Sequence, residues 1–485
     1  MIDVGSGLSP RPRRRALPNA RRWTYSLVPS LASLALVWSF PAAAAAQRAV
    51  FDNVTHRDTL ENGMRVIVVE NHAVPLATVD VVVKTGAMSQ DTTDEGVPHL
   101  FEHMLFSGYR GAGDEEFSDD IGPLHAAYNG ETQEELVSYY LTLPSQSVDR
   151  AIDILARLVR EPHFETDDLN KERMVVLDEM KRDVSDPREH LNMEVSKLLW
   201  GAGWTQKNTL GSALPLFAAT PQRLDQIFHT YYVPNNAALV VTGDVSTSKV
   251  LDWARARFGG WKRRANPYAA HPVPVVPPLT ASRATVITAD VPDVTILVEW
   301  QGPSVATQRS DTYAADVLSQ LVADEESEFQ KRLVESGLFQ AASLGYQTQS
   351  HVGPIEFIGT TTIDHLAAAL TVLQTEVMMM GNDTYFDPDA LSIAAKQRRV
   401  AQSFDLERGP GLAYEYADWW ATSGLDYYMT YGDSLSARTP ADVQRFATRY
   451  LVNRPFAIGA LVRPQDSEKV SAMLQQYLQM TETTP

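Results

Sequence analysis

The spacing of hydrophobic residues along the chain alternates between the period of strands and that of helices. Residues 64–70 and 77–84 are short runs rich in valine, which is typical of β-strands. Apolar residues then recur every three or four positions, as on one face of a helix, in four longer segments. The predicted helices cover residues 148–160, 166–185, 221–231 and 246–257. Strands combined with amphipathic helices predict an α+β fold.

A proline-rich stretch, residues 266–278, divides the chain nearly in half and predicts a semi-rigid extended linker. Strand patterns resume after it, at residues 285–288 and 294–300. One helix pattern of the first half returns in the second. It reads Thr-Pro, then apolar residues four and seven positions after the threonine, and then a tyrosine eleven positions after it. The two copies begin at Thr220 and Thr439, an offset of 219 residues. Chance similarity between amphipathic helices and an internal duplication would both explain this repeat.

The first 46 residues have a different composition. Six arginines precede an apolar stretch from about Tyr25 to Phe40, and a run of alanines ends at Ala46. This order of basic, apolar and small residues predicts a secretory signal peptide cleaved after Ala46. An uncleaved anchor is the alternative, but Pro29 and Pro41 interrupt a span that needs roughly 20 apolar residues. We therefore expect a periplasmic or secreted protein whose mature chain has no stable membrane span.

Composition limits the function classes further. With 485 residues, 44% of them hydrophobic and 21% charged, the chain is long enough for two domains with sizeable cores. Its net charge of −18 opposes nucleic-acid binding and favours neutral or basic substrates. The absence of cysteine excludes disulfides and thiolate metal ligands.

The strongest candidate for chemistry is His99-Leu-Phe-Glu102-His103, a His-x-x-Glu-His sequence. This is the zinc motif of metallopeptidases in reverse order. On a helix, side chains four positions apart share one face, so both imidazoles can reach one ion while Glu102 flanks it. A chance match, on a solvated helix face, is expected in about one chain in a hundred of this length.

A catalytic zinc ion needs a third protein ligand and keeps one position for water. Glu179 is the best candidate because it lies on the predicted helix 166–185. Glu172 precedes it by seven residues, or two turns on the same face, which suits a carboxylate that orients a ligating histidine. The alternative for either glutamate is an ordinary position on a charged helix surface.

The run from Glu95 to Gly108, with Glu179 76 positions after His103, resembles the pitrilysin, insulin-degrading and mitochondrial-processing peptidases, the inverzincins. Further similar segments follow in the same order, and the resemblance covers the amino-terminal half most strongly. These segments are Asn129–Thr132 with Tyr139-Tyr140, Glu161–Phe164, Tyr231–Asn236 and Gly243-Asp244. One departure is Pro98 before the first ligand, which we interpret as helix initiation.

The resemblance implies a zinc metalloendopeptidase that binds one zinc ion per chain through His99, His103 and Glu179. Glu102 would be the general base and Glu172 would support the site. The implied fold is two related α/β-roll domains, each a mixed or antiparallel sheet flanked by helices, which form half of a clamshell. We expect a catalytic domain at 47–264, a linker at 265–280 and a second domain without a metal site at 281–485, as in the short bacterial two-domain branch.

Two further residues are implied to contact substrate. Peptides of this family add a strand to a sheet edge near the metal, which makes Asn129 a candidate for a backbone contact; a turn at Asn129-Gly130 is the alternative. Longer relatives carry an arginine and a tyrosine seven positions apart, and here Arg332 is followed by Phe339. Arg332 is the second candidate, with an ordinary surface cation as the alternative.

The missing tyrosine hydroxyl makes a self-sufficient site doubtful, because such groups stabilise charge on the attacked carbonyl oxygen. Short bacterial members pair up, and we therefore expect a homodimer or a heterodimer with a related subunit. The substrates would be peptides or unfolded polypeptide segments. The competing hypothesis is a non-catalytic scaffold or peptide-binding subunit of the same fold.

Overall fold

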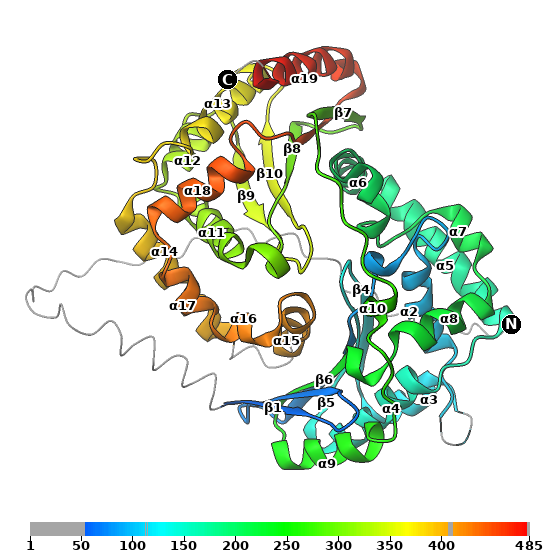
Figure 1. Ribbon diagram of the computed structural model, residues 1–485. Coiled ribbons are helices and arrows are strands. Elements are labelled where there is room, and N and C mark those ends of the chain that lie inside the picture. Colours follow the sequence, from blue (N-terminus) through cyan, green and yellow to red (C-terminus); the bar gives the residue numbers. More distant parts are fainter. Residues whose placement is uncertain (1–53, 112, 114, 406–410, 483–485) are drawn as a thin grey trace, which may run out of the picture. The chain divides into compact units, whose positions relative to one another are not determined.

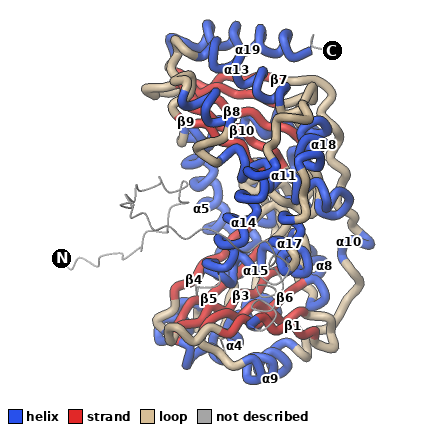
Figure 2. The backbone as a smooth tube through the Cα atoms, turned by 90° about the vertical axis from the view of Figure 1, so that its left-hand side faces the viewer, coloured by secondary structure: helices blue, strands red, loops and turns tan. Residues whose placement is uncertain are grey.

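The structure is a computed structural model that describes residues 54–482, apart from residues 112, 114 and 406–410. The predicted signal peptide lies outside the described residues. All described residues belong to one compact unit. Two mixed sheets flanked by helices build it (Figure 1 and Figure 2), which confirms the predicted α+β fold.

The first sheet carries the amino-terminal half. In the described part of the chain its strands follow the order β1 (Thr55–Thr59), β2 (Arg65–Glu70), β6 (Ala237–Gly243), β3 (Leu76–Val83), β5 (Val137–Pro144) and β4 (Ala127–Thr132). β6 lies between β2 and β3, parallel to the former and antiparallel to the latter. The two strands predicted first are therefore consecutive in sequence but are not hydrogen-bonded neighbours. β4 forms one edge of the sheet.

The four helices predicted at residues 148–160, 166–185, 221–231 and 246–257 are present with bounds that agree to within one residue, whereas a helix at residues 187–200 was not predicted. The described helices of this half are α2 (Val97–Ser107), α3 (Phe117–Ile121), α4 (Val148–Arg160), α5 (Thr166–Ser185), α6 (Pro187–Trp200), α7 (Ala213–Ala218), α8 (Pro221–Tyr231), α9 (Thr247–Phe258) and α10 (Pro267–Ala270). In α4 the apolar residues at spacings of three and four, such as Ile152 and Leu155, are fully buried. The amphipathic pattern thus fixed which face of the helix joins the core.

The second sheet repeats the topology of the first without a counterpart of β1 among the described residues. Its order is β7 (Arg283–Thr288), β11 (Ala457–Val462), β8 (Val294–Gln301), β10 (Pro354–Thr361) and β9 (Ala341–Tyr346). β11 is parallel to β7 and antiparallel to β8, as β6 is to β2 and β3. The shared topology favours duplication over chance as the origin of the repeat.

The helices of the second half follow in a matching order. They are α11 (Val305–Ala323), α12 (Glu328–Gln330), α13 (Leu366–Met379), α14 (Pro388–Asp405), α15 (Gly411–Thr422), α16 (Leu425–Met429), α17 (Tyr431–Ser436), α18 (Pro440–Tyr450) and α19 (Ser467–Glu482). The repeated helix pattern corresponds to α8 and α18, which both begin at a proline. Both are capped by the preceding threonine, whose hydroxyl accepts a hydrogen bond from the backbone N–H of Arg223 or Asp442.

Helices of each half pack on the sheet of the other half. Leu191, Val195 and Trp200 of α6 pack on Leu297 and Leu461 of the second sheet. In the opposite direction α15 and α16 cover one face of the first sheet, and Figure 1 shows α6 beside β7 and α15 near β5 and β6. Full burial of an aliphatic side chain stabilises a fold by about 1.5–3 kcal/mol. This exchange therefore couples the folding of the two halves.

The proline-rich stretch is only in part the extended linker that the sequence predicts. It begins with the short helix α10, and the Tyr268 hydroxyl donates a 2.7 Å hydrogen bond to the backbone carbonyl of Lys84. Residues 271–282 have no regular secondary structure. None of the helices within the described ranges has the length and apolar character needed to cross a membrane.

Candidate metal centre

Helix α2 carries the His-x-x-Glu-His sequence and begins where the sequence predicts. Gly96 precedes it with φ 86°, a left-handed conformation that suits glycine, and Pro98 lies in the first turn. The opposite side of α2 is anchored by Leu100, Phe101 and Met104, which are fully buried in the first core. His99, Glu102 and His103 are therefore presented together by a rigid helix.

Helix α5 packs against α2 and brings Glu179 to the two histidines. The Oε2 atom of Glu179 lies 3.7 Å from Nε2 of His99 and 3.5 Å from Nε2 of His103. Donor atoms from the three side chains all lie within 4.8 Å of one another, and this is the only such group found in the described ranges. The exposed fractions are 15% for His99, 6% for His103 and 15% for Glu179, so the cluster is recessed but accessible.

These distances fit a zinc site. Two donors of a tetrahedral zinc ion, each about 2.0–2.1 Å from the metal, lie about 3.3–3.4 Å from each other. Two imidazole nitrogens and one carboxylate oxygen are also the ligand set of a catalytic zinc ion, which leaves the fourth position for water. The residues present therefore fit the ion that the sequence predicts.

Glu172 lies behind His103 on the same face of α5 as Glu179. Its Oε2 atom is 3.1 Å from Nδ1 of His103, and Ser107 donates a 2.6 Å hydrogen bond to its other oxygen. Burial lowers the pKa of His103, but the hydrogen bonds with Glu172 and Glu179 outweigh it and raise this pKa to about 9. The same negative surroundings would favour a divalent cation at Nε2 in place of the proton.

Glu102 faces the edge strand β4. The Thr132 hydroxyl donates a 2.8 Å hydrogen bond to Oε2 of Glu102, which fixes the orientation of the carboxylate. Gly130, on the same strand, lies so close that an added Cβ would be 2.5 Å from Oε1 of Glu102 and 2.8 Å from the Phe106 ring. The sequence did not reveal that Gly130 makes room for Glu102. Ser107 was also missed, although its place one turn after His103 could have indicated it.

The structure places Asn129 inside β4, opposite Tyr140 of β5. The turn that remained an alternative for Asn129-Gly130 is therefore wrong. Because β4 is the last strand of its sheet, Asn129 lies on the strand whose outer side has no strand partner among the described residues. Asn129 thus lies on the same short strand as Thr132, which donates a hydrogen bond to Glu102.

Arg332 does not join the cluster in this chain. It lies in a π-helical turn, Lys331–Glu335, and its guanidinium is 2.9 Å from Oε2 of Glu328 and 3.5 Å from Oε2 of Glu376. Phe339 is buried in the second core, with its ring centroid 5.6 Å from that of Phe357. Both positions therefore have structural partners within the second half.

The counterparts of α2 and α5 in the repeated topology are α11 and α14. Leu318 and Leu321 of α11 and Leu391 of α14 belong to the second hydrophobic core. The helix pair that carries the donor groups in the first half thus contributes to the core in the second, and it holds no group of three clustered donors in the described ranges.

Comparison with known proteins gives the family. Residues 65–212 match the model described as Insulinase (Peptidase family M16), and residues 218–398 match the Peptidase M16 inactive domain. Together the two matches span about two thirds of the chain. The chain belongs to peptidase family M16. Membership alone leaves activity open, because the second model describes an inactive domain.

M16 relatives include an uncharacterized zinc protease of Bacillus subtilis, 27% identical over 208 residues, which are 43% of this chain and 51% of that protein. The chain thus spans about half the length of this relative. Zinc protease PqqE of Helicobacter pylori is 23% identical over 406 residues, 81% of this chain and 89% of that protein. Both relatives are named zinc proteases.

Solved structures of low sequence identity show the same fold. A protease from Helicobacter pylori superposes with a TM-score of 0.73 at 19% identity, over 84% of this chain and 99% of that one. An M16-like peptidase from Alicyclobacillus acidocaldarius gives a TM-score of 0.74 at 17% identity, over 84% and 98%. The two-sheet architecture is therefore that of short M16 proteins.

Proposed function

We propose that this chain is a zinc-dependent endopeptidase that cleaves peptides or unfolded polypeptide segments. The observation that carries the proposal is the convergence of His99, His103 and Glu179 from two helices, with Glu102 oriented beside them by Thr132. A cluster of three donors together with an ordered carboxylate is what metal-assisted hydrolysis requires, whereas a structural zinc site needs no base.

His99, His103 and Glu179 would hold the ion, and Glu172 would keep the second ring oriented through its Nδ1–H. Zinc bound there supplies Lewis acidity and lowers the pKa of water from about 16 towards about 7. Glu102 removes the proton of the attacking water and then transfers it to the leaving amine nitrogen. Thr132 holds Oε2 of Glu102 throughout, so the base needs no reorientation.

The edge strand β4 suits an extended peptide. A substrate that adds a strand there gains main-chain hydrogen bonds that do not depend on its sequence. Asn129 and Thr132 lie on this strand, and Thr132 contacts the base, so such a peptide would pass the cluster. We assign Asn129 a contact with the substrate backbone.

We also propose a periplasmic or secreted location and assembly with a second M16 subunit. The location is supported by the basic, apolar and small residues at the start of the chain and by similarity to the periplasmic protease PqqL from Escherichia coli, with a TM-score of 0.72. Assembly is supported by Arg332 and Phe339, because both have their partners within the second half. Neither therefore adds a charged or hydroxyl group to the metal cluster of the same chain, and a second subunit would supply it.

A non-catalytic subunit is the second candidate. One structural neighbour belongs to Complex III2 from Candida albicans, and another is a peptidase M16 inactive domain from Pseudomonas fluorescens. The orientation of Glu102 argues against this candidate. A non-catalytic subunit has no use for a carboxylate that Thr132 and Gly130 hold beside the three metal-binding side chains.

The test uses the purified chain without residues 1–46 and a library of internally quenched peptides. We expect cleavage that a chelator abolishes and that one equivalent of Zn²⁺ restores. The assay is repeated with the product of the neighbouring gene, to supply a missing subunit. Zinc binding without cleavage in either case would reject the peptidase and favour the scaffold.

A further inference from the structure

One turn of the second half contacts two segments of the first half that lead to the metal cluster. This turn, residues 347–353, joins β9 to β10 and is called the β9–β10 turn below. Val305 at the start of α11 donates a 3.0 Å backbone hydrogen bond to the carbonyl of Gln349. The next residue, Ala306, donates one of 3.1 Å to the carbonyl of Ser350. These bonds tie the turn to α11 of its own half.

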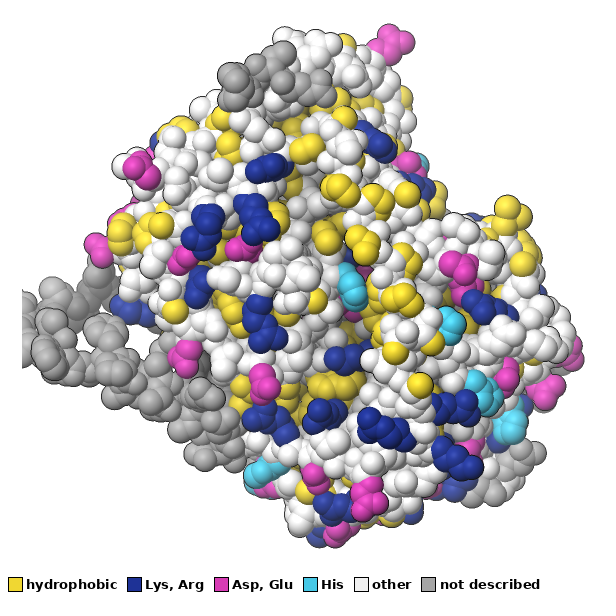
Figure 3. All heavy atoms as spheres, in the orientation of Figure 1, with side chains coloured by type: hydrophobic (Ala, Val, Ile, Leu, Met, Phe, Trp, Pro, Cys, Tyr) yellow, Lys and Arg dark blue, Asp and Glu magenta, His cyan; other side chains and the backbone are white. Residues whose placement is uncertain are grey.

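The first contact is made by Lys207, which follows the short 3₁₀ helix Gly201–Gln206. Its ammonium group donates hydrogen bonds to Oε1 of Gln349 and, at 2.6 Å, to the backbone carbonyl of Val352. The visible Lys and Arg side chains in Figure 3 stand on the surface and form a band across the lower half of that face, whereas Lys207 is only 9% exposed. A buried ammonium group is costly unless acceptors surround it. The β9–β10 turn supplies those acceptors.

The residue after Lys207 holds the segment that leads into helix α2. The backbone carbonyl of Asn208 accepts a 2.7 Å hydrogen bond from the side-chain amide of Gln90. The Oε1 atom of the same Gln90 accepts a 2.8 Å hydrogen bond from the backbone N–H of Gly96. Gly96 directly precedes α2 and lies three positions before His99. The side chain of Gln90 therefore joins the residue after Lys207 to the start of the metal helix.

Close packing makes this link stiff. A Cβ on Gly96 would be 2.6 Å from Cα of Gly211, so the two segments touch through their backbones. The side chain of Asn208 donates a 2.9 Å hydrogen bond to the carbonyl of Gly211 and accepts one of 3.1 Å from its N–H. Both side chains of the link are buried, with 2% of Gln90 and 7% of Asn208 exposed. Because buried polar networks with satisfied hydrogen bonds are rigid, a displacement of Lys207 should displace the start of α2.

The second contact is made by Glu135, in the connection between β4 and β5. Its carboxylate accepts hydrogen bonds of 2.7 and 2.8 Å from the backbone N–H groups of Ser350 and His351. Only 3% of Glu135 is exposed. Thr132, which orients Glu102, lies three residues earlier, at the end of β4. The β9–β10 turn therefore also contacts the segment that follows the strand of the proposed base.

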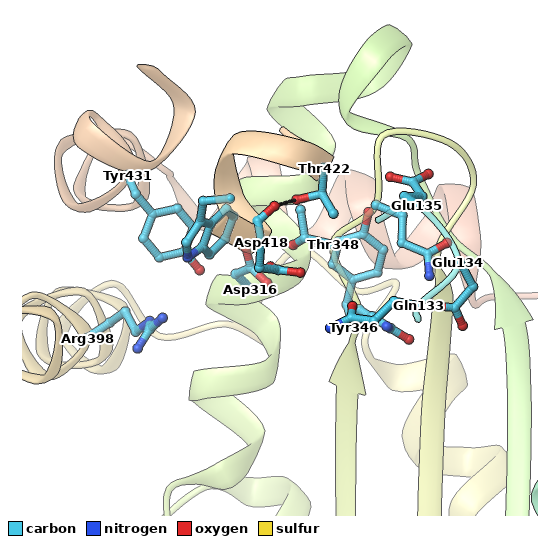
Figure 4. A pocket seen from close by; sticks show the side chains of 13 residues that line it. Gln133, Glu134, Glu135, Asp316, Tyr346, Thr348, Arg398, Asp418, Thr422 and Tyr431 are labelled. Atoms are coloured by element: carbon cyan, nitrogen blue, oxygen red, sulfur yellow. Dashed lines mark hydrogen bonds between the residues drawn. The ribbon is translucent and has the colours of Figure 1, made fainter. Parts of the chain in front are cut away.

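Polar contacts, rather than continuous packing, hold the β9–β10 turn on this side. Figure 4 shows a cavity of about 310 Å³ beside Thr348 of the turn, where Asp316 of α11 and Asp418 of α15 meet. Atoms that line a cavity have no packing partner on that side. The hydrogen bonds of Lys207 and Glu135 therefore decide how the turn meets the first half.

We propose that the β9–β10 turn positions the metal cluster from the second half, with Lys207 fixing the start of helix α2 and Glu135 fixing the end of β4. Lys207 and Glu135 are positioning residues, because neither is among the three clustered donors and both act through other groups. The inference rests on the proposed peptidase function for the roles of α2 and β4. It gives the second half a direct effect on the site of the first.

Hydrogen exchange followed by mass spectrometry tests the Lys207 contact without zinc and without substrate. Lys207→Met keeps an unbranched side chain and removes the donors. We expect amide exchange in residues 97–107 to become about fivefold faster or more, because local opening rises when a segment loses its anchor. Lys249→Met, at an exposed lysine of α9, should exchange like wild type.

A second control separates positioning from a general loss of stability. Val470→Ala shortens a fully buried side chain of α19 in the second core and leaves the turn intact. Exchange in residues 97–107 should be faster in Lys207→Met than in Val470→Ala even where the two melting temperatures agree. Exchange that is no faster in Lys207→Met than in Val470→Ala would overturn the proposal.

The Glu135 contact has a graded test. Glu135→Gln keeps one acceptor for the turn and Glu135→Ala keeps none, so exchange in residues 127–136 should rise from wild type through the first variant to the second. Glu468→Gln, at an exposed glutamate of α19, should leave it unchanged. Equal exchange in all four chains would contradict the role of Glu135.

Zinc affinity and turnover distinguish the two contacts and separate this inference from the proposed function. Lys207→Met should weaken zinc binding about fivefold or more, because the two histidine ligands lie on α2. Glu135→Gln should keep zinc affinity within about twofold and lower kcat, because the strand orients only the base. If no peptide is ever cut, exchange and zinc titration still decide the inference. Cleavage by wild type together with unchanged exchange and zinc affinity in both variants would reject it and leave the proposed function standing.

Discussion

Gly130 and Glu102 lie so close that the missing side chain of one makes room for the carboxylate of the other. A Cβ on Gly130 would be 2.5 Å from Oε1 of Glu102 and 2.9 Å from its Cδ. The glycine thus lets the edge strand approach the metal helix, and Thr132 two positions later then reaches the same carboxylate. One short strand thus forms an edge of the first sheet and positions the proposed base.

Gly130→Ala should displace Glu102 without removing a donor. Because a shift of about 1 Å at a catalytic group can cost about a hundredfold in rate, we expect kcat/KM to fall between ten- and a hundredfold. Zinc per chain, measured by elemental analysis, should stay unchanged. Gly122→Ala is the control, because a Cβ at Gly122 meets no atom within 4 Å. Full activity in Gly130→Ala would show that the close approach has no catalytic role.

Glu102→Gln should separate metal binding from catalysis. The amide keeps an oxygen that can accept the hydrogen bond from Thr132 but cannot take a proton, so turnover should drop by at least a hundredfold. Zinc content should equal that of wild type, since Glu102 is not among the three clustered donors. Glu161→Gln, at an exposed glutamate after α4, controls for loss of charge. Equal turnover in Glu102→Gln and wild type would rule out its role as base.

Glu172→Gln should weaken zinc binding through His103. The carboxylate accepts a hydrogen bond from Nδ1, and loss of such an outer partner typically costs 10- to 100-fold in metal affinity. Competition with a fluorescent chelator measures the change. Asp178→Asn on the same helix, at a side chain that is 66% exposed, should leave the affinity unchanged. An unaltered affinity in Glu172→Gln would make Glu172 a packing residue only.

Buried acids should make stability depend on pH. Burial raises the pKa of Asp80 and of Glu299 to about 8, and both lie beneath the exchanged helices, on β3 and β8. Each folded group retains a proton that the unfolded chain has lost above pH of about 4. Its contribution is therefore fully present at low pH and is lost as pH rises towards 8, at up to about 1.4 kcal/mol per pH unit and group.

Glu299→Gln should flatten this slope. The amide stays neutral at all pH values and can still accept a hydrogen bond from Ser196. Urea unfolding between pH 5.5 and 8 should show wild type losing stability faster than the variant as pH rises. Glu335→Gln, at an exposed site, should follow wild type. Parallel pH profiles for Glu299→Gln and wild type would contradict a raised pKa in the folded state.

The sequence by itself determined the local elements and the cluster on α2. Helices α4, α5 and α8 have the predicted bounds, because apolar spacing acts over a few residues of the backbone, and α8 is also capped by Thr220. The His-x-x-Glu-His sequence placed three groups on one face by helix geometry alone. Its resemblance to a family then identified Glu179 and Glu172, which lie 76 and 69 residues after His103.

Only the tertiary structure decided relationships between distant segments. β6 enters between β2 and β3 more than 150 residues after them, and α6 and α15 exchange sheets, so neither follows from a local pattern. The fit of Gly130 against Glu102 and the meeting of Asp316 with Asp418 in one cavity likewise join separate elements. Local periodicity fixes which face of an element is apolar, but the partner of that face depends on how the whole chain packs.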